Sequence, residues 1–175
     1  MLFPRPAGEN PLFTMDYLWT PWRYSYVANA AQDPGCPFCR ALEAGDDART
    51  LIVERAAKNF IILNRYPYTT GHVLIVPYAH LADLAALDST TLDEMMQLAQ
   101  RVQRALATAY KPEGFNLGMN LGRVAGAGVA GHLHLHLLPR WAGDTNFMAT
   151  TAETRNLPED LAHTCRKLRA ALRQG

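Results

Sequence analysis

Three of the six histidines of the chain, His132, His134 and His136, lie within five residues, and a leucine follows each of them. Near neutral pH an imidazole can attack phosphorus as a nucleophile, transfer a proton or bind a metal ion. Because the side chains of an extended segment alternate between two faces, we expect the imidazoles on one face and the leucines on the other. The leucine face predicts a contact with the core. The histidine face predicts a cleft or a metal site, whereas the alternative, a solvated strand face, does not require histidine.

Two of the three cysteines, Cys36 and Cys39, form a Cys-x-x-Cys pair. This spacing lets both thiolates bind one tetrahedral ion such as zinc, but two ligands do not complete a site. One alternative is a redox-active dithiol, although no β-α-β pattern adjoins the pair. The other is a pair of thiols without any ligand. The third cysteine, Cys165, is interpreted as an inert thiol on the apolar face of a helix.

Glycine recurs between residues 114 and 131, immediately before the three histidines. Glycine lets the backbone adopt a positive φ or approach a ligand closely. The exposed backbone N–H groups of such a turn can form an anion-binding concavity. A phosphate cradle next to a nucleophilic imidazole would form one coherent site, and a flexible surface loop is the alternative.

The apolar pattern predicts five strands and two main helices to position these residues. The expected strands lie within residues 50–64 (two strands), 72–76, 115–120 and 131–139. From Thr91 apolar residues recur at helical spacing, with Thr91 and Glu94 forming a capping box. A second helix is expected over residues 158–173. This order predicts an α+β fold with a mostly antiparallel five-stranded sheet.

The composition predicts one compact domain. The chain has 175 residues, 49% of them hydrophobic, and its formal net charge is +1. We expect residues 15–175 to form a single domain and residues 1–14, which contain three prolines, to form a poorly ordered leader. The small charge gives no reason to expect a nucleic-acid partner, although it allows a nucleotide-sized anion. No stretch approaches the roughly 18 apolar residues of a membrane helix, and the odd cysteine count favours a reduced, cytoplasmic protein.

The histidine segment resembles the signature of the histidine triad (HIT) family, in which three histidines alternate with apolar residues and two apolar residues follow the third. Residues 132–138 read His-Leu-His-Leu-His-Leu-Leu, a full match, and the similarity extends from about residue 19 to about residue 172. Residues 64–67 and 71–77 resemble the nucleoside-binding strand pair of the family. Residues 18–23 and 143–148 resemble, more narrowly, its bacterial diadenosine tetraphosphate phosphorylase branch.

This resemblance implies the HIT-like fold and a nucleotidyl transfer through a covalent histidine intermediate. His134 would attack the α-phosphorus of a dinucleoside polyphosphate, and His136 would lie beside the phosphoryl oxygens or the leaving group. The resemblance also implies that His132, the first histidine of the signature, belongs to the catalytic residues. The amides of Gly126 and Gly128 would stabilise charge at the phosphate.

The resemblance also implies a nucleotide-binding site. Asn64 would hold the ribose hydroxyls, Ile62 and Leu74 would form an apolar wall for the base, and His72 belongs to the same strand pair. Asn120 would face the phosphate or the leaving group. A phosphate acceptor would make the protein a diadenosine tetraphosphate phosphorylase, a transferase that releases ADP and ATP.

Other outcomes of the same site are an asymmetric dinucleoside polyphosphate hydrolase with water as acceptor, a nucleoside phosphoramidase, or a nucleotide-binding sensor without turnover. The family further implies a homodimer and no organic cofactor. Some members with the cysteine pair complete a zinc site with a histidine after the nucleoside strands and with the first triad histidine. Here these residues are His80 and His132, which with Cys36 and Cys39 would form a structural Cys2His2 metal-binding site.

Overall fold

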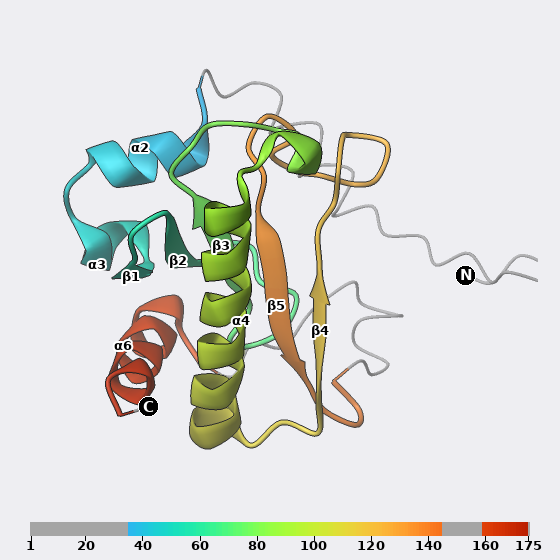
Figure 1. The fold of residues 1–175 in the computed structure, drawn as a ribbon. Coiled ribbons are helices and arrows are strands. Elements are labelled where there is room, and N and C mark those ends of the chain that lie inside the picture. Colours follow the sequence, from blue (N-terminus) through green and yellow to red (C-terminus); the bar gives the residue numbers. More distant parts are fainter. Residues whose placement is uncertain (1–34, 145–158, 175) are drawn as a thin grey trace, which may run out of the picture.

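The computed structural model describes residues 35–144 and 159–174 of the chain (Figure 1). Residues 1–14, residues 18–23 and most of the segment 143–148 lie outside this part. The elements, in chain order, are α2 (Pro37–Glu43), α3 (Asp47–Thr50), β1 (Ile52–Arg55), β2 (Asn59–Leu63), β3 (Val73–Pro77), the 3-10 helix η1 (Leu84–Ala86), α4 (Ser89–Tyr110), β4 (Gly114–Gly118), β5 (Leu135–Arg140) and α6 (Leu161–Leu172). Among the helices of the described residues, none has the length and apolar character needed to span a membrane.

The five strands form one sheet in the order β1-β2-β3-β5-β4, and every neighbouring pair is antiparallel. The expected α+β fold with a five-stranded sheet is therefore confirmed. Strand β5, which comes last in the chain, lies between β3 and β4, and β4 forms an edge. This order brings the histidine segment next to the strand pair that carries Asn64 and His72.

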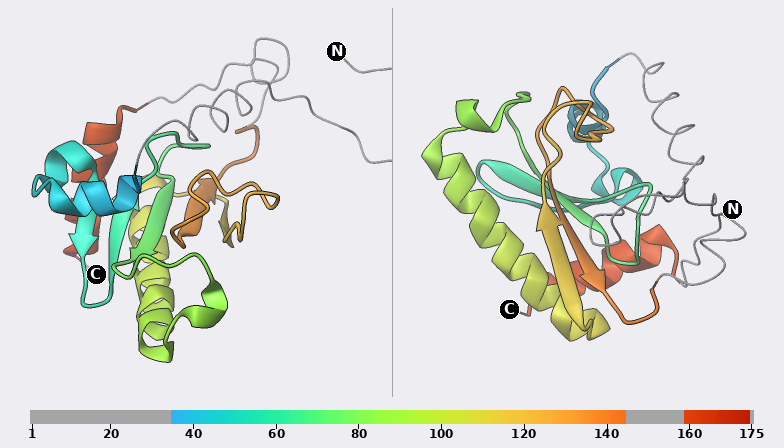
Figure 2. Two further views of the ribbon diagram at one scale, coloured as in Figure 1. Left: turned by 90° about the horizontal axis from the view of Figure 1, so that it is seen from above. Right: turned by 90° about the vertical axis from the view of Figure 1, so that its right-hand side faces the viewer.

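Each face of the sheet packs against a different set of helices, because side chains along a strand alternate between the faces. One face packs on α4 and α6 (Figures 1 and 2). Its buried residues include Val53, Ile61, Ile75, Leu135, Leu137, Met95, Val102 and Leu168. The other face packs on α2 through Phe38. Its buried residues include Ile52, Phe60, Ile62, Leu74 and Val76. The site residues belong to this second face.

The start of α4 differs from the expected capping box. The side chain of Asp88 caps the helix by accepting the N–H of Thr91 at 3.0 Å. Glu94 does not reach back to the helix start. Its carboxylate instead accepts backbone N–H groups of the β1–β2 turn, including those of Lys58 and Asn59 at 2.8 Å. The Glu94 carboxylate therefore binds the β1–β2 turn, whereas in a capping box it would accept the backbone N–H at the start of its own helix.

The histidine strand begins later than expected. Strand β5 starts at Leu135, so only His136 of the three histidines lies within it. Continuing the register Ile75 to Leu135 would pair Leu133 with Pro77, which has no N–H to donate. The N–H of Leu133 donates instead to the carbonyl of Leu81 at 2.7 Å. The alternation is nevertheless present within β5, because Leu135 and Leu137 pack in the cluster with α4, whereas His136 pairs with Leu74 of the other cluster.

Two short helices, α2 and α3, were not expected from the sequence. The N-cap of α2 is Cys36, whose side chain makes no capping hydrogen bond, and Pro37 occupies the first helical turn. The start of α2 therefore lacks the Ser, Thr, Asp or Asn signal from which helix starts are recognised. The C-terminal helix was expected and is present as α6, with Cys165, Leu168 and Leu172 buried.

Candidate active site and metal centre

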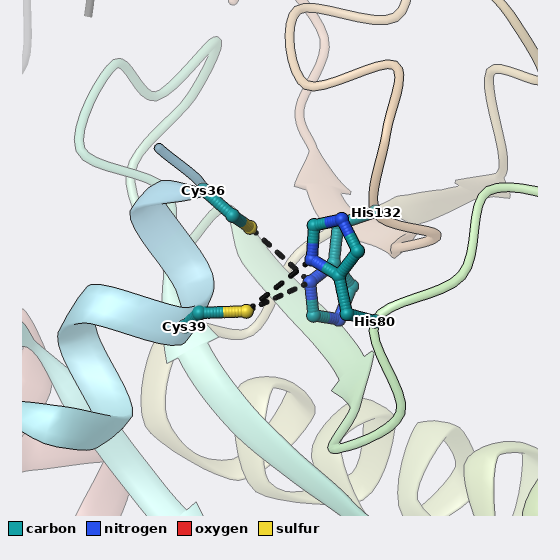
Figure 3. A group of neighbouring side chains, drawn as sticks. All are labelled: Cys36, Cys39, His80 and His132. Atoms are coloured by element: carbon teal, nitrogen blue, oxygen red, sulfur yellow. Dashed lines mark hydrogen bonds between the residues drawn. The ribbon is translucent and has the colours of Figure 1, made fainter. Parts of the chain in front are cut away.

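Four side chains from three separate parts of the fold meet at the start of α2 (Figure 3). Cys36 and Cys39 come from the beginning of α2, His80 follows β3, and His132 precedes β5. The sulfur of Cys36 lies 3.2 Å from Nδ1 of His132, and the sulfur of Cys39 lies 3.3 Å from Nδ1 of His80. All four potential ligand atoms lie within 4.8 Å of one another. The structure thus brings together the four residues expected to form the metal site.

The donor set fits a tetrahedral ion. Zinc bond lengths to sulfur and nitrogen imply a sulfur–nitrogen separation of about 3.6 Å across a tetrahedral site. The three separations found are 3.2, 3.3 and 3.7 Å. Nε2 of His132 lies 2.9 Å from the carbonyl of Pro77 and donates its proton there. Nδ1 of His132 therefore carries a lone pair towards the cysteines, as a metal-bound histidine with an outer hydrogen bond does.

His134 is held as a neutral imidazole with one defined nucleophilic nitrogen. Its Nδ1–H donates to the carbonyl of His132 at 2.8 Å, which leaves the lone pair on Nε2. Burial lowers the pKa of His134, although the hydrogen bond to His132 acts in the opposite direction. The ring of Phe38 packs against His134 with its centroid 5.2 Å away. The side chain can thus act as a nucleophile without first losing a proton.

His136 is linked to His72, a contact that the sequence did not reveal. Nε2 of His72 lies 2.9 Å from Nδ1 of His136, and His72 is only 1% exposed. The rings of His134 and His136 meet edge to face with their centroids 4.9 Å apart. Three histidines of the second sheet face therefore form one contiguous cluster. The sequence signal for this cluster is that His72 opens the expected strand 72–76, which the resemblance assigns to the nucleoside-binding strand pair.

The expected nucleoside-binding residues lie next to this cluster. The Asn64 Oδ1 accepts the N–H of Tyr66 at 3.0 Å, and its Nδ2 donates to Nδ1 of His72 at 3.3 Å. Ile62 and Leu74 are paired across β2 and β3 and are buried against Phe38. These residues form an apolar floor directly beside the imidazoles.

The glycine-rich turn differs in part from expectation. Gly126 has a φ of +90°, which glycine adopts readily, but its N–H donates to the carbonyl of Arg123 at 2.9 Å. This amide is therefore engaged within the turn instead of facing an anion. Gly128 is half-buried beside Val129, which packs against the Phe38 cluster. Asn120 is half-buried and follows the end of β4, where Gly118 pairs with His136.

The fold and the site together define a class of protein: an α+β domain in which alternating histidines border an antiparallel sheet. Comparison with known proteins agrees with this class. The family model described as "HIT domain" matches residues 46–143. The AP-4-A phosphorylase of Mycobacterium tuberculosis is 35% identical over an alignment 175 residues long that covers 95% of this chain and 88% of that protein. The chain belongs to the HIT family.

Two further relatives cover most of the chain. The adenosine 5′-monophosphoramidase of Saccharomyces cerevisiae is 32% identical over 131 residues, which cover 75% of this chain and 77% of that protein. A zinc-bound histidine triad family protein from Mycobacterium smegmatis has a TM-score of 0.65 and 33% identity, and the match covers 80% of this chain and 94% of that one.

Proposed function

We propose that this protein is a diadenosine tetraphosphate phosphorylase that works through a covalent adenylyl-His134 intermediate. The observation that carries the proposal is the hydrogen bond from Nδ1–H of His134 to the His132 carbonyl, because it leaves Nε2 as a defined nucleophile. The similarity to the mycobacterial AP-4-A phosphorylase over 95% of this chain supports the choice of substrate and acceptor.

The reaction divides into two displacements at the same phosphorus. First, the lone pair on Nε2 of His134 forms a bond to the α-phosphorus, and the bond from that phosphorus to the bridging oxygen breaks. ATP leaves with the electron pair of that bond. An oxygen of inorganic phosphate then attacks the same phosphorus, the P–N bond breaks, and ADP leaves while its electron pair returns to Nε2. Covalent catalysis of this kind replaces one difficult step by two easier ones.

The neighbouring residues bind and orient the nucleotide. His136 borders the ring of His134, and we assign it the phosphoryl or leaving-group oxygens. Asn64 is assigned to the ribose hydroxyls, while Ile62 and Leu74 provide the apolar contact for the base. His72 is assigned an indirect role through its hydrogen bond to His136. Asn120 and the backbone of Gly128 are assigned to the phosphate.

We propose that Cys36, Cys39, His80 and His132 bind a structural zinc ion. Four protein ligands leave no open coordination position, so the ion would tie α2 to the histidine segment and would not activate the substrate. Thiols that serve as ligands must stay reduced, which supports a cytoplasmic location.

We also propose that two copies pair through β4. This strand is an edge of the sheet, and its Leu117 is 49% exposed. Leu121 follows it and is 46% exposed. An edge strand with exposed apolar side chains is a template for a second chain. Analytical ultracentrifugation of the wild type and of Leu117→Lys tests this pairing, which predicts a dimer and a monomer respectively.

The function is tested by product analysis. The purified protein is incubated with diadenosine tetraphosphate with and without inorganic phosphate, and the nucleotides are separated. Formation of ADP and ATP only with phosphate supports the phosphorylase. Formation of AMP and ATP in water indicates a hydrolase, and no turnover contradicts an enzymatic role. His163→Ala is the matched control for His134→Ala, because the His163 side chain is 54% exposed on α6.

A further inference from the structure

Tyr68 lies in the turn between β2 and β3 and contacts both His72 and His136. Its ring centroid is 4.8 Å from that of His72 and 6.4 Å from that of His136. The Tyr68 and His136 rings are nearly parallel, with an angle of 12° between their planes. The tyrosine ring therefore packs on the two imidazoles that hydrogen-bond to each other.

The backbone of Tyr68, together with the side-chain amide of Asn64, determines which nitrogen of His72 carries the proton. The N–H of Tyr68 donates to Nδ1 of His72 at 3.1 Å, so Nδ1 holds a lone pair. A neutral His72 then carries its proton on Nε2, which lies 2.9 Å from Nδ1 of His136 and donates to it. By the same reasoning, a neutral His136 carries its proton on Nε2.

The turn that carries Tyr68 is anchored on both sides. The Thr69 hydroxyl donates to the carbonyl of Pro139 in β5 at 3.1 Å. Gly71 has a φ of +81°, and a Cβ at this position would lie 3.0 Å from a Leu106 methyl carbon. The N–H of Tyr68 is thus held in place by contacts with both β5 and α4.

We propose that Tyr68 is a positioning residue that acts through His72 to make His136 a hydrogen-bond donor to the reacting phosphate. Its amide, together with the Asn64 side chain, sets the tautomers of both histidines, and its ring keeps their hydrogen bond aligned while nucleotide enters. This inference rests on the proposed adenylyl transfer only for its effect on rate. The tautomers are a property of the protein without nucleotide.

The role assigned to His136 needs no net proton transfer. Its Nε2–H donates a hydrogen bond to an oxygen that gains negative charge as the α-phosphorus is attacked, and the proton stays on His136. The leaving polyphosphate departs with its bonding electron pair as an anion. A preorganised donor to such an oxygen contributes about 10²–10³-fold to the rate, and a misaligned donor loses part of this.

The first test determines the tautomers by long-range ¹H–¹⁵N NMR of the labelled protein without nucleotide. We expect His72 and His136 of the wild type each to carry the proton on Nε2. Tyr68→Ala keeps the backbone N–H, so we expect the variant to keep these tautomers and the loss of the ring to act on the rate measured in the second test. A proton on Nδ1 of His136 in the wild type would overturn the proposal.

The second test uses a double-mutant cycle on the rate of adenylyl-His134 formation in a single turnover, followed by mass spectrometry. Tyr68→Ala is expected to lower this rate about tenfold or more, with the nucleotide Kd changed less than about threefold. Tyr68→Phe should restore the wild-type rate. In a His136→Ala background, Tyr68→Ala should have no further effect, because its action passes through His136.

An equal loss of rate in both backgrounds, or no loss in either, would contradict a role through His136. Tyr66→Ala is the matched control for disturbance of the turn, since Tyr66 lies two residues away and is 58% exposed. It should keep the wild-type tautomers. If the wild type forms no adenylyl-His134, the proposed function fails, while the tautomers measured without nucleotide still decide the role of Tyr68.

Discussion

Glu94 joins α4 to the β1–β2 turn, and its replacement by alanine is expected to destabilise the fold by about 2–4 kcal/mol. The carboxylate accepts the N–H groups of Ala57, Lys58 and Asn59 and the side-chain amide of Asn59, at 2.8–3.0 Å. Ala57 and Lys58 are not buried, so water can replace two of these bonds. Asn59 is 0% exposed, so its backbone N–H and the one amide hydrogen that bonds Glu94 would lose their partner in the interior, while the amide still donates to the Thr91 carbonyl at 3.0 Å. Each such buried donor costs about 1–3 kcal/mol, which gives the range above after partial relaxation.

Urea unfolding measures this effect, with Asp93→Ala as the control. Asp93 is the exposed neighbour of Glu94 on the same helix, and its replacement should change the stability by less than about 0.5 kcal/mol. A loss below about 1 kcal/mol for Glu94→Ala, or an equal loss for Asp93→Ala, would refute the assignment of the energy to buried donors.

The Glu94 carboxylate also makes the stability of the fold depend on pH, and the direction of this dependence follows from its pKa. Burial alone would raise the pKa of Glu94, but the hydrogen bonds from Asn59, Lys58 and Ala57 outweigh it and hold the pKa below its ordinary value of 4.5. A carboxylate with a lowered folded-state pKa stabilises the fold above its unfolded pKa, and this contribution is lost as the pH falls through the folded pKa. The difference in stability between the wild type and Glu94→Gln should therefore be full at neutral pH and shrink below pH 4.5.

Three further substitutions test the site and its support. Cys36→Ser should lower the zinc content, measured by elemental analysis, from about one ion per chain to near zero and should lower the Tm, whereas Cys165→Ala should keep the metal. His134→Ala should reduce turnover at least about a thousandfold and leave nucleotide affinity, measured by calorimetry, within a few-fold. Gly71→Ala should cost about 1–3 kcal/mol in urea unfolding, because a Cβ there meets Leu106 at 3.0 Å; Gly45→Ala, with a positive φ but open space, should cost less.

The sheet and its main helices followed from patterns that act locally. Alternating leucines predicted the side of β5 that packs against the helices, and the helical spacing of Met95 and Val102 predicted the face of α4 that is buried. The family resemblance supplied His80 as the partner of the cysteines, and the fold brings its Nδ1 to 3.3 Å from Cys39. Period and motif were sufficient here because neither depends on the exact register of distant strands.

The features that escaped prediction depend on contacts between distant segments. His72 and His136 are 64 positions apart, and their hydrogen bond exists only because β5 lies beside β3. Glu94 fits a local capping box as well as a distant turn, and the sequence pattern favours the local partner. The start of β5 was placed too early because its limit is set by Pro77 on the neighbouring strand. In each case the residue that determines the contact lies far away in the sequence, so local periodicity does not reveal it.

His132 connects the proposed metal centre to the proposed nucleophile, although it is assigned to neither the attack nor the nucleotide. Its Nδ1 faces the cysteine sulfurs, its Nε2–H donates to the Pro77 carbonyl, and its own carbonyl accepts Nδ1–H of His134. Phe38, which lies between the two cysteines in the chain, packs against both imidazoles. A shift of His132 would therefore change the tautomer or the direction of the nucleophilic nitrogen of His134. In the proposed function, metal binding and nucleophilic attack would thus be linked through the backbone of His132, without a coordination position for the substrate.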